Sequence, residues 1–152
     1  MSETNKAIVR RLTEAGGGSG EDYGVVLREL MASDGIAHLP FGDHYGPEGV
    51  ALDAIEWGKA FPDMTVVVLD LFADGNRVAR RFQLSGTHLG PFLGLAPTGR
   101  RMAITGLAID HLAAGKIQES WVEFDLRGLQ RQLTADHLSP TRASDDRKGS
   151  AR

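Results

Sequence analysis

Hydrophobic residues recur at helical spacing in the N-terminal part of the chain. The pattern predicts helices over residues 5–15, 21–31 and 47–61. Four glycines among residues 16–20 separate the first two helices, because so many glycines cannot hold a helix. The third helix begins near Pro47, a residue suited to a first helical turn. Its apolar stripe consists of Val50, Ala54, Trp57 and Phe61.

Apolar runs with the composition of β-strands follow the third helix. Strands are predicted over residues 65–72 and 77–88, joined by an Asp-Gly hairpin turn at residues 74–75. A second hairpin has strands over residues 106–112 and 117–125, with a tight turn between them. The chain therefore places its helices first and its long antiparallel strands afterwards.

A short strand around residues 36–39 and a last helix over residues 126–133 complete the predicted elements. This order indicates an α+β fold: a curved antiparallel sheet with the N-terminal helices packed on its concave face, forming a cone-shaped pocket. We expect a single domain over residues 1–134. Residues 135–152 contain almost no apolar side chains, so we expect a disordered C-terminal tail.

Composition narrows the classes of function. The net charge of the 152 residues is −3 and the basic residues are scattered, which argues against nucleic acid or an anionic membrane as a partner. The absence of cysteine excludes disulfides and thiolate metal sites. No apolar run approaches membrane-spanning length and residues 1–20 lack an apolar signal core, so we expect a cytoplasmic protein.

The second hairpin gathers the strongest candidate chemistry. Side chains alternate between the two sides of a strand, so Leu107, Ile109 and His111 share one side. One side of the returning strand holds Ile117, Glu119, Trp121, Glu123 and Asp125. If these sides coincide, an imidazole, an indole and several carboxylates meet in one apolar patch. Apolar surroundings disfavour the charged form of a carboxylate, which makes it a useful proton acceptor.

Motifs spread over residues 5–133 show a resemblance to a known family. The most specific are Gly86-Thr-His88, Pro97-Thr-Gly-Arg100 and Glu119-x-Trp-x-x-x-Asp125. The others are Asn5-Lys-Ala-Ile-Val-Arg10, Asp34-Gly-Ile-Ala-His38, Phe61-Pro-Asp63, Asp74-Gly-Asn-Arg-Val78 and Arg81. The sequence resembles the SnoaL-like polyketide cyclases, within the nuclear transport factor 2-like (ketosteroid-isomerase-like) superfamily.

The resemblance implies an enzyme of antibiotic biosynthesis. Founding members close the last ring of an anthracycline-type aromatic polyketide by intramolecular aldol condensation, without a metal or an organic cofactor. Their acid/base aspartate at a strand end matches Asp125, and a pocket histidine on the preceding strand matches His111. The expected partner is a small polyketide substrate, and a homodimer or homotetramer is implied. His38 falls near the place of a polar substrate-contacting residue in the family.

Further side chains are expected to contact the substrate. Aromatic core residues could also line a pocket for a flat ligand. Arg80 and Arg81 are adjacent, so one faces inward, where an arginine could bind an oxygen; an ion pair of Arg81 with a glutamate on the last strand is the favoured reading. The predicted substrate-binding set is His38, Phe41, Trp57, Phe61, Arg81, His88, Ile109 and Trp121.

Several alternatives stay open. Asp125 immediately precedes a predicted helix, where aspartate is a preferred N-cap, and a carboxylate bonded to backbone is a weak base. His111 could be a core histidine, and His88 could stabilise a strand end. The spacing of His38 and His44 matches no known metal site. The function could instead be that of a hydroxylase, an epoxide hydrolase, an isomerase or a non-catalytic ligand-binding module.

Overall fold

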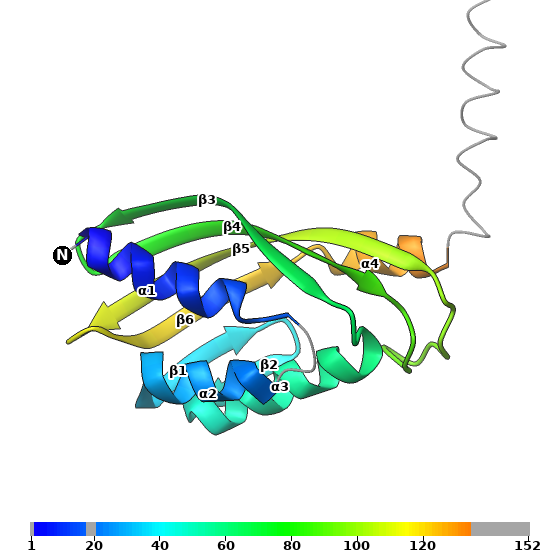
Figure 1. Ribbon diagram of the computed structural model, residues 1–152, viewed down its shortest axis with the longest axis horizontal. Coiled ribbons are helices and arrows are strands. Elements are labelled where there is room, and N and C mark those ends of the chain that lie inside the picture. The colour runs from blue at the N-terminus through cyan, green and yellow to red at the C-terminus, as the bar shows by residue number, and fades with distance from the viewer. Residues whose placement is uncertain (1, 18–20, 135–152) are drawn as a thin grey trace, which may run out of the picture.

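Four helices and six strands make up the part of the chain that the computed structural model describes, residues 2–17 and 21–134 (Figure 1). The helices are α1 (Ser2–Glu14), α2 (Glu21–Leu30), α3 (Gly46–Ala60) and α4 (Leu126–Leu133). The strands are β1 (Met31–Leu39), β2 (Gly42–Tyr45), β3 (Thr65–Asp74), β4 (Arg77–Thr87), β5 (Arg101–Ala113) and β6 (Lys116–Phe124). The predicted tail, residues 135–152, lies outside the described residues.

All six strands belong to one sheet, in the order β2-β1-β6-β5-β4-β3. Neighbouring strands run antiparallel except β1 and β6, which pair in parallel. The predicted α+β class is confirmed, and the sheet is curved, open and mixed rather than wholly antiparallel. The hairpin at Asp74 and Gly75 and the bounds of α4 also agree with the sequence pattern.

The three N-terminal helices cover one face of the sheet, which curves around them (Figure 1). α1 contacts β3 and β4, while α2 packs on α3 and α3 packs on β1. Even-numbered side chains of β4 and β5 point into this layer and are buried, whereas most odd-numbered ones face the other side. Burial of the apolar even-numbered residues therefore fixes which side of each strand is the inner one. Among the described residues, no helix is long and apolar enough to cross a membrane.

The segment after α2 differs from its prediction. It forms a nine-residue strand, β1, where the sequence pattern indicated a strand only around residues 36–39. The register of β1 against β6 shifts between Met31 and Ile36, and Gly35 lies at this irregularity. A Cβ on Gly35 would lie 3.0 Å from the carbonyl oxygen of Ala32. The irregularity breaks the period-2 alternation, which is why the pattern did not reveal the whole strand.

The long loop between β4 and β5 is fixed against the end of α3. The backbone N–H groups of Leu89 and Gly90 both donate to the carbonyl of Ala60, at 2.9 and 3.1 Å. Glycine is required at position 90, because a Cβ there would lie 2.2 Å from the carbonyl oxygen of Lys59. The loop thereby places the Phe92 ring 4.7 Å from the ring of Trp57.

Candidate active site

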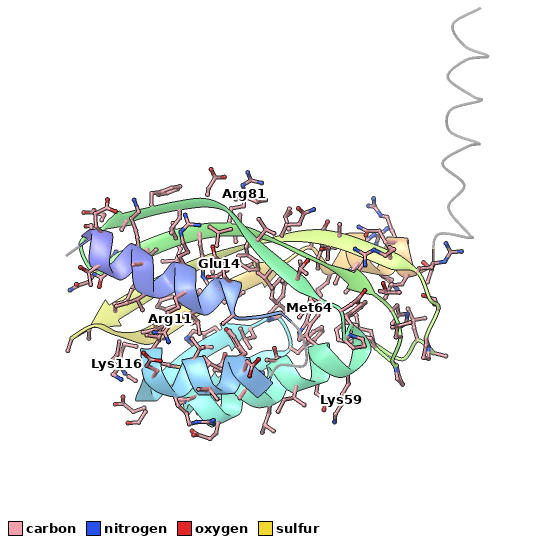
Figure 2. The ribbon with its side chains drawn as sticks, in the orientation of Figure 1. Arg11, Glu14, Lys59, Met64, Arg81 and Lys116 are labelled. Carbon is pink, nitrogen blue, oxygen red and sulfur yellow. The ribbon has the colours of Figure 1, made fainter. Side chains whose placement is uncertain are left out.

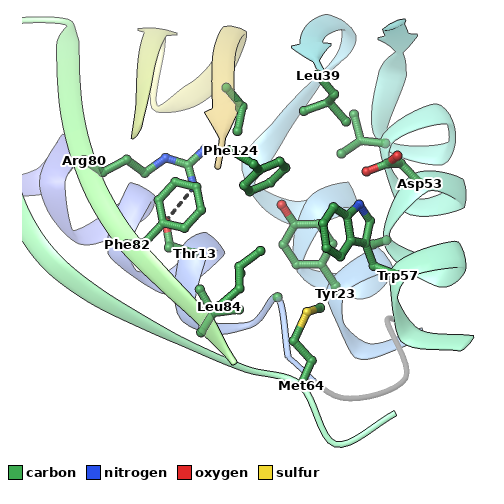
Figure 3. A pocket seen from close by; sticks show the side chains of 15 residues that line it. Thr13, Tyr23, Leu39, Asp53, Trp57, Met64, Arg80, Phe82, Leu84 and Phe124 are labelled. Atoms are coloured by element: carbon green, nitrogen blue, oxygen red, sulfur yellow. Dashed lines mark hydrogen bonds between the residues drawn. The ribbon is translucent and has the colours of Figure 1, made fainter. Parts of the chain in front are cut away.

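A cavity lies between the inner face of the sheet and the helices (Figure 3). The cavity has a volume of about 90 Å³ and belongs to a hollow of about 600 Å³ that includes open solvent. Most of the wall is apolar: Leu39, Val50, Ala54, Trp57, Met64, Val66, Phe82, Leu84, Val122 and Phe124. Four polar or charged side chains join it: Thr13, Tyr23, Asp53 and Arg80. An apolar hollow with a few converging polar groups is typical of a small-molecule site.

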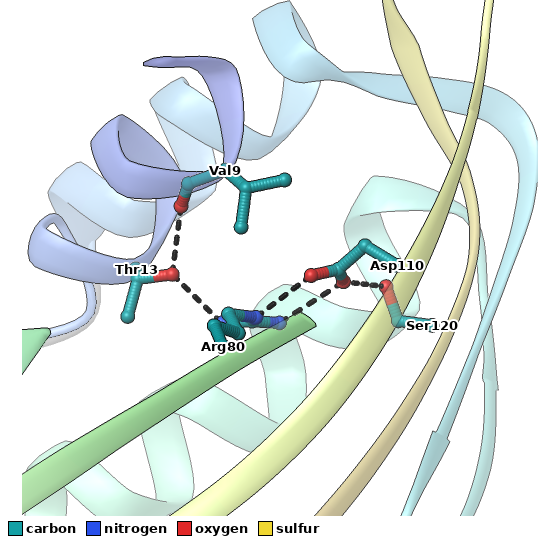
Figure 4. Close-up of polar contacts among 5 residues, drawn as sticks. All are labelled: Val9, Thr13, Arg80, Asp110 and Ser120. Carbon is teal, nitrogen blue, oxygen red and sulfur yellow. Dashed lines mark hydrogen bonds and ion pairs between the residues drawn. The ribbon is translucent and has the colours of Figure 1, made fainter. Parts of the chain in front are cut away.

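Arg80 of β4 is held on the sheet wall by a buried network (Figure 4). Its Nε and Nη2 donate to the two carboxylate oxygens of Asp110 on β5, at 2.8 and 3.1 Å. Nη1 donates to the hydroxyl oxygen of Thr13 at 2.9 Å, and that hydroxyl donates to the carbonyl of Val9. The hydroxyl of Ser120 donates to Asp110. Asp110 is fully buried and Arg80 is 8% exposed.

The network keeps Arg80 charged. Burial by itself would lower the pKa of Arg80, but the charges of Asp110 and Tyr23 and the hydrogen bonds to Asp110 together raise it. Removing one partner of a buried ion pair leaves an uncompensated charge, at a cost of about 3–5 kcal/mol. The guanidinium is therefore a fixed cation at the cavity wall.

Asp53 reaches the cavity from the opposite side, on α3 (Figure 3). Burial raises the pKa of Asp53, and the nearby His44 imidazole opposes that shift only in part. The Nε2 of His44 lies 3.9 Å from Asp53 Oδ1 and is buried without a hydrogen-bond partner among the described residues. Asp53 is thus a carboxylate with weakened solvation, which is the property that a proton-accepting side chain in a pocket needs.

Tyr23 of α2 is the third polar group of the cavity. Burial raises the pKa of the Tyr23 phenol, the charge of Arg80 opposes this, and the charges of Asp110 and Asp53 add to it. The phenol is therefore neutral near pH 7 and can act as a hydrogen-bond donor. The three ionisable groups of the cavity, Arg80, Tyr23 and Asp53, thus come from three different elements, β4, α2 and α3. Within the described residues, no set of three or more histidine and acidic side chains could hold a metal ion.

Sequence reasoning missed Asp53, Asp110, Tyr23 and the inward role of Arg80. A signal for Asp53 was present, because it lies three residues after Val50 and four before Trp57, within the apolar stripe of the third helix. Alternation also places Asp110 on the opposite side of its strand from His111. What the sequence could not decide is which side of that strand faces the helices.

The predicted patch on the second hairpin does form. His111 pairs with Glu119, Ile109 with Trp121 and Leu107 with Glu123, so the two strand sides coincide as expected. The patch faces away from the helices, however, with Ile109 50% and Trp121 39% exposed. His111, Ile109 and Trp121 therefore lie on the outer face and not at the helix-covered cavity, because the even-numbered residues of β5 are the buried ones, and their expected roles stay predictions.

The outer face carries a shallow groove of about 430 Å³. Its apolar floor includes Phe72, Leu107, Ile109 and Trp121. Arg81 lies here, above the sheet (Figure 2). Its Nε donates to Asp70 at 2.6 Å, so its ion-pair partner is Asp70 and not the expected glutamate of β6. The homo-oligomer implied by the resemblance stays a prediction, for which this exposed apolar face would be a suitable contact surface.

His38 connects three strands at the outer face. Its Nε2 contacts Glu119 at 2.7 Å and its Nδ1 contacts Asp43 at 2.8 Å, while its ring stacks on Trp121 with centroids 5.3 Å apart. The ring of His111 lies edge-on against Trp121 from the other side, at 4.7 Å. Hydrogen bonds to Glu119 and then to Asp43 raise the pKa of His38.

The other four residues predicted to contact the substrate lie in different parts of the structure. Trp57 lines the cavity, and Phe61 is fully buried, with its ring 6.0 Å from that of Trp57. His88 is fully buried, and its Nδ1 accepts a hydrogen bond from the backbone N–H of Thr98. Phe41 is 47% exposed and contacts the ring of Phe92. Of these four, only Trp57 is a wall residue of the cavity.

Asp125 caps α4. Its Oδ1 accepts a hydrogen bond from the backbone N–H of Gly128 at 2.8 Å. A Cβ at Gly128 would lie 2.2 Å from Asp125 Oδ2, so glycine is what allows the carboxylate to approach this closely. Asp125 is exposed and is not a wall residue of the cavity. The capping alternative therefore has direct geometric support, and a catalytic role stays a prediction.

A curved mixed sheet with helices on one face is the fold of the nuclear transport factor 2-like class of proteins. A family model described as SnoaL-like polyketide cyclase matches residues 24–133. An aklanonic acid methyl ester cyclase, AcmA of Streptomyces galilaeus, is 31% identical over 131 residues, covering 84% of this chain and 88% of AcmA. The chain belongs to the SnoaL-like polyketide cyclase family.

Solved structures agree with this assignment. A candidate SnoaL-like polyketide cyclase from Jannaschia sp. CCS1 has a TM-score of 0.80 at 26% identity, covering 88% of this chain and 94% of its own. IdmH, a candidate polyketide cyclase from Streptomyces antibioticus, has a TM-score of 0.73 at 34% identity, and the match covers 86% of this chain and 98% of IdmH. The likeness covers the whole sheet-and-helix domain rather than a part of it.

The cap and the catalytic role of Asp125 can be separated by two substitutions. Asparagine is as good an N-cap as aspartate but cannot accept a proton in the same way, whereas alanine caps poorly. We expect Asp125→Ala to lower the free energy of unfolding by about 0.5–2 kcal/mol and Asp125→Asn to lower it much less. Urea denaturation measures both. Equal losses of stability in the two variants would contradict the capping role.

The contacts of His38 predict a pH-dependent stability. Because its pKa is raised in the folded state, the contribution of its contacts is fully present below the unfolded-state pKa of about 6.5 and is lost as the pH rises through the folded-state pKa. The stability difference between the wild type and His38→Gln should therefore shrink as the pH rises above about 6.5. Urea denaturation from pH 6 to 9 tests this, and a difference that grows with pH would contradict it.

Proposed function

We propose that this protein is a cofactor-independent polyketide cyclase, which closes a ring of an aromatic polyketide by intramolecular aldol condensation with Asp53 as the acid/base. The observation that supports this most is the position of Asp53, a carboxylate with weakened solvation at the wall of an aromatic-lined cavity. Family membership and the cyclase relatives support the reaction class.

The reaction needs one proton acceptor that later becomes a proton donor. The Asp53 carboxylate removes a proton from a carbon that lies between two carbonyl groups of the bound substrate, giving an enolate. The enolate carbon attacks a ketone carbon of the same molecule, which forms the new carbon–carbon bond and an alkoxide. The protonated Asp53 returns the proton to that alkoxide. The ring closure as written is an aldol addition without loss of water, so the product is an isomer of the substrate and no further reactant is consumed.

The cavity walls would supply the positioning. Trp57 of α3, Phe82 of β4 and Phe124 of β6 present aromatic rings suited to a flat ligand, with the centroids of Trp57 and Phe124 5.3 Å apart. A multi-ring ligand would extend from the small cavity into the open part of the hollow. Holding the enolate carbon near the ketone replaces a slow intermolecular encounter by an oriented one.

The Tyr23 phenol would assist by donating a hydrogen bond to a substrate oxygen. It is neutral near pH 7 because burial raises its pKa. His44 is placed to support Asp53, because a small shift of the imidazole would close the 3.9 Å separation to a hydrogen bond. Such a bond would orient the carboxylate without taking part in carbon–carbon bond formation.

Substitution of Asp53 tests the proposal. We expect Asp53→Asn to lower kcat for ring closure by about 10²–10⁴-fold, the usual contribution of a positioned acid/base group. The assay substrate is aklanonic acid methyl ester, after which AcmA is named, and product formation is followed by chromatography. Asp22→Asn, an exposed change on α2, is the matched control and should keep wild-type activity.

The pH profile and the Asp125 variant sharpen this test. Because the base must be ionised and burial raises the pKa of Asp53, activity should rise with pH through a value above the ordinary ~3.9 of aspartate. Full activity of Asp53→Asn together with loss of activity in Asp125→Asn would overturn the assignment and move the base to Asp125.

A further inference from the structure

We infer that Arg80 is a catalytic residue: its guanidinium donates hydrogen bonds to the substrate oxygen on which negative charge develops when Asp53 removes the proton. The inference rests on the proposed function and adds a group that stabilises the enolate. The ligand class is that of the proposed function, flat aromatic molecules that carry an acidic enol or phenol oxygen.

The number of N–H groups on Arg80 leaves room for a ligand. A guanidinium has five N–H donors, and three of them are used, two by Asp110 and one by Thr13. One N–H on Nη1 and one on Nη2 have no acceptor among the described residues. Arg80 is also a wall residue of the cavity, where the Phe82 ring lies 5.3 Å from its Cζ, and these two N–H groups are the donors that we assign to a ligand oxygen.

The two charged groups lie on opposite walls. Arg80 extends from the sheet and Asp53 from α3, and in the view of Figure 3 the rings of Phe124 and Tyr23 appear between them. The pKa of Tyr23 responds to the charges of both, which places the two groups within electrostatic reach of the same position. A substrate held there has its acidic carbon on the Asp53 side and its carbonyl oxygens on the Arg80 side.

This arrangement stabilises the enolate more than the neutral substrate. Proton transfer removes negative charge from Asp53 and places it on a carbonyl oxygen, closer to the Arg80 cation. Asp110, Ser120 and Thr13 already hold the network in place, so little reorganisation is needed as the charge moves. Surroundings of low polarity make such a hydrogen bond stronger than it would be in water.

Alizarin (1,2-dihydroxyanthraquinone) is a probe that needs no turnover. It is flat and aromatic, and its absorption changes when a phenol ionises to a phenolate, which resembles the enolate. We expect alizarin bound to the wild type to ionise at a lower pH than free alizarin. A bound ionisation that moves to higher pH would overturn the inference.

A double variant separates the role of Arg80 in ligand binding from its role in folding. Arg80→Gln alone leaves Asp110 buried without its partner and is expected to be poorly folded. Arg80→Gln with Asp110→Asn replaces the ion pair by a neutral hydrogen-bonded pair. Alizarin bound to this folded double variant should ionise at least about one pH unit higher than in the wild type, a tenfold loss of preference for phenolate. Arg80→Lys keeps the charge but loses the forked donors. Alizarin bound to it should ionise at a pH between the values for the wild type and the double variant.

Two controls fix where the probe binds and what the charge change does by itself. Arg77→Gln removes one positive charge from the exposed side of the same strand and should leave the bound ionisation unchanged. In a Trp121→Phe background the intrinsic tryptophan fluorescence of the protein comes from Trp57, which lines the cavity. Alizarin should quench it; absence of quenching would mean binding outside the cavity and would contradict the inference.

Turnover distinguishes this inference from the proposed function. The double variant should close the ring with kcat lowered about 10²-fold and KM changed much less, as for removal of an oxyanion donor. If Asp53→Asn keeps full activity but alizarin ionises as expected, the base assignment fails and the role of Arg80 in binding charged oxygen stands. If the double variant keeps both the wild-type kcat and the wild-type ionisation of alizarin, the role of Arg80 is refuted.

Discussion

The buried ion pair between Arg80 and Asp110 constrains the rest of this structure. Two charges inside an apolar layer are tolerated only when they are paired and fully hydrogen-bonded, so β4 and β5 must align such that both side chains face the helices. A register slip of one residue would turn Arg80 outward and Phe82 with it. The same network reaches Thr13 and thereby ties α1 to the sheet at the edge of the cavity.

The two faces of the sheet consequently have different chemistry. The inner face holds a fixed cation, a carboxylate of raised pKa and a neutral phenol around an aromatic cavity. The outer face holds exposed apolar side chains, with ion pairs such as Arg81–Asp70 and His38–Glu119 around them. Reacting groups benefit from a place where water is limited, and among the described residues the inner face holds the buried Arg80 and Asp110 and the half-buried Asp53.

Much of the fold could be predicted from the sequence, because the signals are local. Pro47, the Asp-Gly turn and the alternation in the later strands defined most elements, and alternation correctly placed Leu107 and Ile109 on one side of their strand and Trp121 and Glu123 on one side of the next. The choice of inner face could not be predicted, since Leu107 and Ile109 on one side of β5 are as apolar as Met102 and Ala108 on the other. The site also joins residues far apart in sequence, from Thr13 to Asp110, which no local pattern brings together.

The most direct test of this account is the pKa of the Asp53 carboxyl, measured by carbon-detected NMR with Asp53→Asn to assign the resonance. We expect a pKa clearly above the ordinary value of about 3.9, because burial at the cavity wall disfavours the ionised form. We also expect a bound flat aromatic ligand to raise this pKa further by excluding water. An Asp53 pKa at or below the ordinary value would contradict the account, since the carboxylate would then be a well-solvated or hydrogen-bonded group and a poor proton acceptor.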